Sequence, residues 1–256
     1  MATTAQPPQV QPAGPRPKIS CLMVTKGDLF PAGFAIQCYR RQTYPNRELV
    51  VVCDRPDNGV KRWIEQLNDP SIRYIEAEKA TLGALRNISV EAAEGELLCQ
   101  WDDDDLYHPR RLGFQHRQLV KSGKAAHFLS NWVIWWPKRR LLGISNARVW
   151  EGSMLVRKDI FPKYPEKALG EDTHAIVALS RKHKFEMTRA PGLYCYIVHG
   201  NNSWNTQHFE TMFKMAARLV PQERYDAQVE NLAKHMPLKA YAAGIAKKAD
   251  TYSLID

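Results

Sequence analysis

Short hydrophobic runs alternate with amphipathic segments along the first half of the chain. Four runs rich in Val, Ile and Leu have the length of buried β-strands. They cover residues 19–25, 48–53, 72–75 and 96–101. Segments with the period of a helix follow them at residues 34–41, 60–67, 82–93 and 109–121. This alternation predicts an α/β fold with a mostly parallel, Rossmann-like sheet flanked by helices.

The pattern changes in the second half of the chain. Two aromatic-rich segments, residues 127–136 and 141–150, flank a Pro-Lys-Arg-Arg turn and predict a β-hairpin. Residues 173–183 have helical periodicity, and residues 192–198 have the composition of a further strand. The remaining chain is amphipathic, so we expect a helical C-terminal extension over residues 207–256.

The composition is that of an ordinary globular protein. Hydrophobic residues make up 44% of the 256 residues, and charged residues make up 25%. The first 17 residues contain five prolines and no apolar signal-peptide core, so residues 1–17 are expected to form a disordered leader. The longest apolar runs are far shorter than the ~18 residues that span a bilayer, which predicts no transmembrane segment.

The cysteines are five in number and widely spaced in hydrophobic surroundings. An odd, scattered set predicts reduced core thiols rather than a disulfide framework or a zinc site. Reduced thiols favour a cytoplasmic setting, with peripheral contact at the inner face of the membrane left open.

The charge balance is basic. Lys and Arg outnumber Asp and Glu by 36 to 27, which gives a formal net charge of +9. This charge favours anionic partners: nucleic acid, anionic lipid head groups or phosphorylated small molecules. It does not select among these three classes.

Four consecutive aspartates, residues 102–105, follow the last strand of the first half. Ligands of such sheets bind at the carboxyl ends of the strands, where Asp54 also lies. Neighbouring carboxylates repel one another unless a cation compensates them, and hard oxygen donors suit Mg²⁺ or Mn²⁺. The alternative is a solvated acidic turn in which Asp105 helps to start the next helix.

Two common nucleotide-binding signatures are missing from the sequence. No Gly-x-Gly-x-x-Gly follows a predicted strand, and no Walker A sequence is present. Their absence argues against dinucleotide oxidoreduction and against phosphoryl transfer by a P-loop. A metal site that binds phosphates remains.

A series of motifs in fixed order resembles the family 2 glycosyltransferases. It comprises a first strand ending at Thr25, Gln42-Thr43-Tyr44 before a Val-rich strand and Asp54, Gly83 with Arg86-Asn87, Ala92-Ala93-Glu94-Gly95-Glu96, and Trp101 before the four aspartates. The resemblance covers residues 19–204. It implies a GT-A fold and the inverting transfer of a sugar from a nucleotide diphosphate to an acceptor hydroxyl.

The same resemblance suggests a division of the chain. We expect a glycosyltransferase domain over residues 18–206, preceded by the leader and followed by the helical extension. Residues 18–125 are its expected nucleotide-binding half. Residues 126–206, with the aromatic-rich hairpin, are its expected acceptor half.

The resemblance assigns donor-binding roles at the carboxyl ends of the strands. Asp54 matches the family aspartate that hydrogen-bonds the nucleobase, typically uracil, so UDP is the expected nucleotide. Thr25 is expected near the base, and Arg86 is expected to face the diphosphate. The segment Cys53-Asp54-Arg55-Pro56 departs from the acidic pair and Gly-Ser that family members often carry. The identity of the base therefore stays open.

The aspartate run matches the family Asp-x-Asp motif. This match places Asp102 near the ribose and the metal, and makes Asp104 a metal ligand. The motif can also be read one residue later, so Asp103 joins the expected donor site, paired with Asp105. His199, in a His-Gly-Asn segment, is expected to complete the Mg²⁺ or Mn²⁺ site.

The expected catalytic residues are Asp172 and, before it, Glu171. They match the family Glu-Asp motif, whose aspartate is the general base toward the acceptor, within hydrogen-bond reach of its hydroxyl. The simpler alternative is that Asp172 stabilises the start of a helix. Trp150 and Gly152 lie where related enzymes present a loop beside the donor sugar and the acceptor.

The expected function is therefore metal-dependent transfer from a nucleotide sugar to a glycan, lipid or protein acceptor. One alternative is a sugar-phosphate nucleotidyltransferase, which shares the sheet architecture. The other is a non-catalytic basic module that binds nucleic acid or lipid surfaces. The basic module leaves the four aspartates without a role, because they repel a phosphate backbone, and no nucleic-acid partner is expected.

Overall fold

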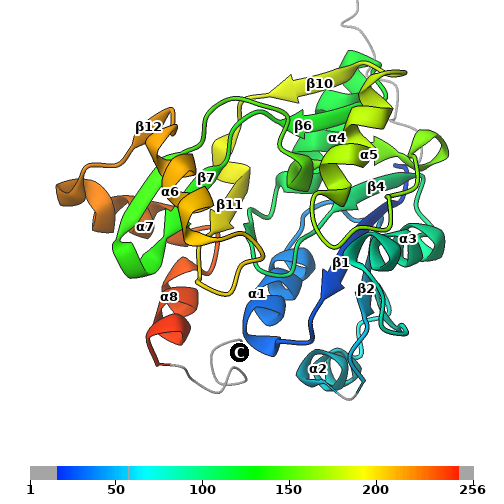
Figure 1. The fold of residues 1–256 in the computed structure, drawn as a ribbon, viewed down its shortest axis with the longest axis horizontal. Coiled ribbons are helices and arrows are strands. Elements are labelled where there is room, and N and C mark those ends of the chain that lie inside the picture. Colours follow the sequence, from blue (N-terminus) through cyan, green and yellow to red (C-terminus); the bar gives the residue numbers. More distant parts are fainter. Residues whose placement is uncertain (1–15, 57, 248–256) are drawn as a thin grey trace, which may run out of the picture.

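The first half of the protein alternates strands and helices as its sequence predicts (Figure 1). The strands are β1 (Ile19–Thr25), β2 (Arg47–Cys53), β3 (Ile72–Glu76) and β4 (Leu97–Gln100). The helices between them are α1 (Leu29–Arg40), α2 (Gly59–Leu67) and α3 (Leu82–Ala92). The computed structural model describes residues 16–56 and 58–247. Residues 1–15 of the predicted leader and 248–256 of the predicted extension lie outside the described residues.

These strands form the larger of two sheets with segments from the second half. Helix α4 (Arg111–Ser122) leads into β6 (Ala126–Leu129), β9 (Leu155–Arg157) follows, and α5 (Glu171–Ser180) precedes β10 (Phe185–Thr188). The strand order is β10-β6-β9-β4-β1-β2-β3. Only β9 in this order runs antiparallel to its neighbours. The predicted mostly parallel α/β sheet is confirmed.

Helix α1 begins earlier than the predicted residue 34. The Asp28 carboxylate accepts a hydrogen bond from the backbone N–H of Phe30 at 3.1 Å, so Asp28 caps the helix. Pro31 lies in the first turn, where its missing N–H costs no hydrogen bond. The capping residue, rather than the apolar run, therefore sets the start.

The second sheet is smaller and has the strand order β12-β8-β7-β11-β5. Its strands are β5 (Leu106–Tyr107), β7 (Val133–Trp136), β8 (Leu141–Ile144), β11 (Tyr194–Ile197) and β12 (Arg218–Leu219). β7 and β8 pair antiparallel around the turn Pro137–Arg139, which confirms the hairpin. The hairpin is shorter than predicted, because residues 126–129 belong to the larger sheet and residues 145–150 form a loop.

The C-terminal part contains α6 (Thr206–Lys214), α7 (Tyr225–Ala233) and α8 (Leu238–Lys247), which agrees with the predicted helical extension. The short β12 interrupts it and was not predicted. The Tyr241 ring of α8 lies 5.0 Å from the ring of Phe30 and 5.2 Å from that of Phe34, so α8 packs on α1. In the described ranges, no helix is long and apolar enough to cross a membrane.

All five cysteines are free thiols with side chains in the core. Cys21 and Cys99 face each other on the paired strands β1 and β4. Burial raises the pKa of the Cys38 thiol to about 12 and that of the Cys195 thiol well above its usual value. The prediction that the cysteines are thiols of the core agrees with these positions.

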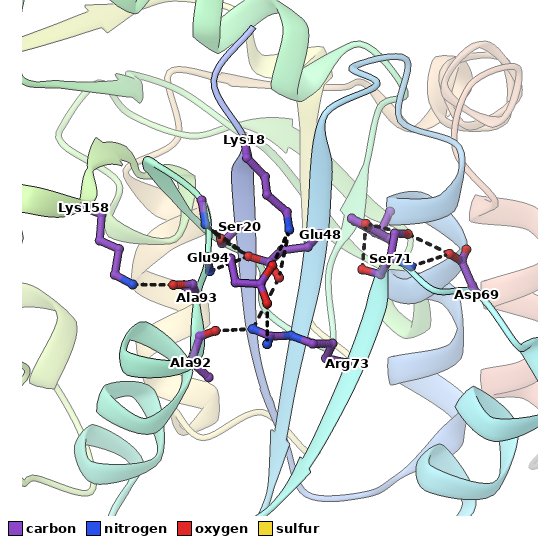
Figure 2. Close-up of polar contacts among 12 residues, drawn as sticks. Lys18, Ser20, Glu48, Asp69, Ser71, Arg73, Ala92, Ala93, Glu94 and Lys158 are labelled. Carbon is purple, nitrogen blue, oxygen red and sulfur yellow. Dashed lines mark hydrogen bonds and ion pairs between the residues drawn. The ribbon is translucent and has the colours of Figure 1, made fainter. Parts of the chain in front are cut away.

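A polar cluster lies at the amino ends of the parallel strands (Figure 2). We call Lys18, Ser20, Glu48, Arg73 and Glu94 the amino-edge cluster. The buried Glu48 Oε1 accepts hydrogen bonds from Ser20 Oγ at 2.6 Å and from the backbone N–H of Glu94 at 2.6 Å. Lys18 and Arg73 both pair with Glu48 and with Glu94. This cluster joins β1, β2, β3 and the turn before β4.

Candidate functional site

The aspartate run lies at the carboxyl edge of the larger sheet, directly after β4. Trp101 anchors the start of the run, because its buried indole donates a hydrogen bond from Nε1 to the Ala35 carbonyl at 3.0 Å. Thr25 and Asp54 lie at the same edge, since Thr25 pairs with Cys53 in the β1–β2 register. The structure thus gathers residues from three strand ends, as parallel topology requires.

Asp102 is held from several sides. Its Oδ1 accepts hydrogen bonds from Gln100 Nε2 at 2.6 Å and from Arg86 Nη2 at 3.3 Å. Its Oδ2 accepts one from the Tyr194 hydroxyl at 3.3 Å. A Cβ at Gly152 would lie 2.9 Å from this Oδ2, so only glycine lets the loop approach so closely. The predicted residues Asp102, Arg86 and Gly152 are therefore neighbours.

Asp104 and His199 form a second contact at this edge. His199 Nε2 lies 3.1 Å from Asp104 Oδ2, and the exposed fractions of the two side chains are 11% and 27%. The backbone N–H of His199 donates to Asn202 Oδ1 at 3.0 Å, which orders the loop after β11. The sequence paired these residues as metal ligands, and the fold brings them into contact across 95 positions of the chain.

Asp103 interacts with Asp104 and with Thr25. Burial, and then the negative charge of Asp104, raise the pKa of the Asp103 carboxyl to about 7. A hydrogen bond with the Thr25 side chain opposes this rise. Thr25 and Asp103, each expected in the donor site, are thus neighbours.

Asp105 is inside the protein and has an exposed fraction of 1%. Its Oδ2 accepts a hydrogen bond from the Tyr194 hydroxyl at 2.6 Å, and its Oδ1 accepts one from the backbone N–H of Ile197 at 2.9 Å. The solvated acidic turn considered from the sequence is therefore wrong for Asp105. Both oxygens of Asp105 are therefore occupied by bonds to β11. This favours reading the Asp-x-Asp motif as Asp102 and Asp104 over reading it as Asp103 and Asp105.

Arg86 links the aspartate run to helix α5. Its Nε donates a hydrogen bond to Glu171 Oε1 at 2.7 Å, and the residue is 8% exposed. Although burial acts in the opposite direction, the charges of Asp102 and Glu171 raise the pKa of Arg86. Arg86 is thus a buried, doubly paired cation and not the solvated side chain that an arginine on a helix usually is.

The loop before α5 is fixed by α3. The side-chain amide of Asn87 donates to the Tyr164 carbonyl at 2.9 Å and accepts from the Tyr164 N–H at 2.8 Å. A Cβ at Gly83 would lie 1.9 Å from the carbonyl oxygen of Pro165. The motif residues Gly83 and Asn87 therefore hold the chain that leads into α5.

Asp172 lies in the first turn of α5. Its Oδ1 accepts a hydrogen bond from the Thr173 N–H at 2.7 Å, while the capping position is occupied by Gly170. Burial, with Glu171 and Glu151 nearby, raises the pKa of the Asp172 carboxyl to about 6, and Arg86 opposes this rise. Glu171 is only 2% exposed and accepts from Arg86, so Asp172 is the more accessible carboxylate of the two.

Aromatic rings form the wall beside Gly152. The Trp132 ring stacks on Tyr194 at a centroid distance of 4.2 Å and packs on Trp150 at 4.6 Å. Trp150 is 6% exposed and donates from Nε1 to the Asn146 carbonyl at 3.1 Å. Trp150 is therefore mainly a packing residue that shapes this wall.

Arg111 and Tyr194 were missed by sequence reasoning. Arg111 is fully buried, donates from Nη2 to the carbonyls of Gln100 at 2.9 Å and Gly152 at 3.1 Å, and lies over the Tyr194 ring. No local signal distinguishes Arg111 from a solvated base on an amphipathic helix. Tyr194 did carry a signal, since it lies on the predicted strand 192–198 that leads directly to His199.

The carboxylates do not by themselves enclose a metal ion. No group of three or more His, Cys, Asp or Glu side chains in the described part of the chain converges as a metal site. Asp104 and His199 still fit Mg²⁺ or Mn²⁺, because these ions are commonly held by one or two protein ligands together with substrate phosphates. The arrangement thus supplies a hard oxygen, an imidazole and, connected to the aspartate run through Arg86 and Glu171, the accessible carboxylate of Asp172.

Part of the chain matches the model of a known protein family. Residues 33–155 match the family model of glycosyl transferase family 2. WcaA of Escherichia coli K12, named as a colanic acid biosynthesis glycosyl transferase, is 35% identical over 109 residues, 41% of this chain and 39% of that protein. An uncharacterized glycosyltransferase of Rickettsia felis is 33% identical over 34% of this chain and 15% of its own length. The matches thus span well under half of these relatives.

Two solved structures resemble the fold at 15% sequence identity. Staphylococcus aureus TarS 1-349 in complex with UDP covers 77% of this chain with a TM-score of 0.58, over 69% of its own chain. The mannosyltransferase PcManGT of Pyrobaculum calidifontis, in complex with GDP-Man and Mn²⁺, covers 92% with a TM-score of 0.55, over 87% of its own chain. At this identity the likeness shows the shared fold.

Proposed function

Because the chain belongs to glycosyl transferase family 2 and is an enzyme with the GT-A fold, we propose that it is an inverting, metal-dependent glycosyltransferase. Its donor is a nucleotide diphosphate sugar, with UDP as the expected nucleotide. The observation that carries this proposal is the pairing of Asp104 with His199 at the edge where Asp172 also lies. The family assignment argues against the alternative function of a basic, non-catalytic binding module. No observation favours the other alternative, a nucleotidyltransferase.

The donor half of the site is assigned to the strand ends. Asp54 follows β2 and Thr25 ends β1, and this shared edge supports assigning both residues to the base and its ribose. Asp104 and His199 would hold Mg²⁺ or Mn²⁺, and Asp102 faces the same edge. When bound, the metal neutralises the diphosphate and stabilises it as a leaving group. The hydrogen bond between the Thr25 and Asp103 side chains supports the assignment of Thr25 to this donor region.

The acceptor half is assigned to Asp172. Its carboxylate accepts the proton of the acceptor hydroxyl as the acceptor oxygen forms a bond to the anomeric carbon. The bond between that carbon and the phosphate oxygen breaks on the opposite face, and its electron pair leaves with the nucleotide diphosphate. A pKa of about 6 leaves Asp172 largely ionised at neutral pH, which a general base requires.

Arg86 and Glu171 position this base instead of reacting. Arg86 connects the buried Glu171, next to Asp172, with Asp102 of the aspartate run. The distance between the general base and the donor edge is therefore fixed by a paired cation. The diphosphate contact expected for Arg86 stays a prediction, since its Nε and Nη2 already bond to carboxylates.

The test is donor hydrolysis across a panel of UDP-glucose, UDP-galactose, UDP-GlcNAc and GDP-mannose, with Mn²⁺, Mg²⁺ or a chelator. We expect metal-dependent hydrolysis of one or a few donors.

Asp104→Ala should weaken metal-dependent binding of the nucleotide diphosphate by about 10- to 100-fold in calorimetry, because it removes a ligand and local charge. Asp159→Ala is the matched control, since Asp159 is exposed and pairs with Arg157 at the end of β9. Unchanged affinity of Asp104→Ala in the presence of metal would contradict the assignment.

A further inference from the structure

Tyr196 is a residue of the site that the proposed function has not used. It follows Tyr194 by two positions on β11, so both side chains leave the strand on the same face. The Tyr194 hydroxyl bonds to Asp102 and Asp105 on that face, at 3.3 and 2.6 Å. Tyr196 therefore lies on the carboxylate side of β11, toward the end of the strand that leads to His199.

Aromatic contacts fix the Tyr196 ring. Its centroid lies 5.4 Å from that of Trp132 and 6.2 Å from that of Phe209 on α6. Both neighbours contact Tyr196 through aromatic rings, which hold its ring in place and contain no carboxylate. Among the described residues the Tyr196 hydroxyl forms no hydrogen bond, although the ring is largely buried.

The charges that act on Tyr196 come from both sides of the site. Burial raises the pKa of its hydroxyl well above the usual value, and Asp105, Asp104, Asp102 and Asp172 raise it further. Asp104 belongs to the aspartate run and Asp172 to α5. The hydroxyl is thus neutral at physiological pH, and it belongs to the strand face on which Tyr194 bonds to Asp102 and Asp105.

In an inverting transfer the sugar occupies the space beside these carboxylates. Its anomeric carbon must lie between the departing phosphate, on the side of Asp104 and His199, and the acceptor oxygen next to Asp172. A neutral phenol both donates and accepts, which suits a sugar hydroxyl. A carboxylate accepts only, and a further negative charge among these aspartates would be repelled.

Building on the proposed function, we propose that the Tyr196 hydroxyl hydrogen-bonds a hydroxyl group of the donor sugar and selects its orientation. The ligand class is the pyranose of a nucleotide sugar, and not the nucleotide or the diphosphate. Tyr196 thereby separates recognition of the sugar from recognition of its carrier.

The first test compares two ligands on Tyr196→Phe by calorimetry with Mn²⁺ present. The ligands are the nucleotide sugar that the donor panel selects and the matching nucleotide diphosphate. We expect about 5- to 20-fold weaker binding of the nucleotide sugar, the effect of one lost hydrogen bond, and unchanged binding of the diphosphate within about twofold. Tyr44→Phe is the control, because its hydroxyl bonds to the Pro17 carbonyl at the amino edge. Equal losses for both ligands, or no loss for either, would overturn the proposal.

The second test changes the ligand instead of the protein, so that folding is not affected. It uses deoxy analogues of the same donor sugar. One deoxy analogue should bind the native protein more weakly than the complete donor sugar does. Tyr196→Phe should bind that analogue and the complete donor sugar equally well, because both changes remove the same hydrogen bond. Losses that are additive for every analogue would overturn the proposal. A native protein that binds nucleotide diphosphates but no nucleotide sugar would contradict the proposed function itself, which distinguishes the two failures.

Discussion

Two clusters of acidic groups lie at opposite edges of the same parallel sheet, and they differ in how their charge is balanced. In the amino-edge cluster, Lys18 and Arg73 each pair with both Glu48 and Glu94, and backbone N–H groups fill the remaining positions on Glu48 Oε1. The pKa of Glu94 is lowered there, first by its hydrogen bond from Lys18. The charges are fully compensated within the protein.

The carboxyl edge has the opposite balance. Carboxylates from residues 102–105 and from α5 face Arg86 and the titratable His199. The pKa values of Asp103 and Asp172 are raised to about 7 and about 6, in both cases first by burial. The comparison shows that cations of the protein balance the carboxylates at the amino edge, whereas the carboxyl edge has fewer cations than carboxylates. Such a deficit is typical of sites that a metal ion completes.

The largest effect is expected at the carboxyl edge, in Asp172→Asn. The amide keeps the shape of the side chain but cannot accept the acceptor proton, so transfer should fall by roughly 10² to 10⁴-fold. Donor and metal binding should persist in calorimetry. If Asp172 only stabilised the helix start, the variant would lose about 1 kcal/mol of stability and keep its turnover. Turnover and melting temperature, measured on the same preparation, separate the two roles.

The amino edge should respond in stability and not in rate. Glu48→Ala removes the acceptor of Ser20 and of two backbone N–H groups, and leaves two cations with fewer partners. We expect a loss of about 3 kcal/mol in the free energy of unfolding, measured with urea. At temperatures well below the melting point kcat should match that of the native enzyme. A large drop in kcat with intact folding would show that the two edges are not separate.

A tenfold effect is expected at the nucleobase contact, in Asp54→Ala. Nucleotide diphosphate binding should weaken by about tenfold, because one charge-assisted hydrogen bond contributes about 1.5 kcal/mol. Affinity for Mn²⁺ alone should stay the same, since Asp54 follows β2 and not the aspartate run. Equal affinity of the native enzyme for all nucleotide diphosphates would remove the assigned role of Asp54.

The smallest effect concerns the pH dependence of kcat/KM. The base must be ionised, so activity should fall as the pH drops below about 6 and reach a plateau above it. Arg86 lowers the pKa of Asp172, while Glu171 and Glu151 raise it. Glu171→Gln should therefore shift the midpoint to lower pH, and it keeps an oxygen that can accept from Arg86. The control Glu91→Gln alters an exposed pair with Lys163 and should leave the profile in place. A midpoint that moves to higher pH would contradict the placement of Glu171 beside the base.

The sequence predicted the parts of this fold that rest on local patterns. The runs of β1 and β2 are long, Val-rich and buried, and the aspartate run follows β4 directly, so strand ends and acidic residues could be placed together. Strands β5, β9 and β12 could not be predicted, because two or three residues carry no measurable period. Their existence depends on partners that are remote in the chain.

The same limit applies to the site. Asp104 and His199 could be named from motifs, since each residue type has its own chemistry. The roles of Arg86 and Asp105 could not, because they depend on which side chains the fold brings against them: Glu171 for Arg86, and Tyr194 for Asp105. Arg111 is the extreme case, a fully buried cation with the sequence context of a surface residue.

The burial of all five thiols has a practical consequence for watching this enzyme at work. Labelling reagents such as maleimides and nitroxides have poor access to buried thiols, so the native chain offers little background to labelling. A single cysteine introduced at the exposed Asn201, in the loop that carries His199, would then be the dominant reactive group. A spin label or fluorophore at that position reports directly whether the loop changes its motion when a nucleotide sugar arrives.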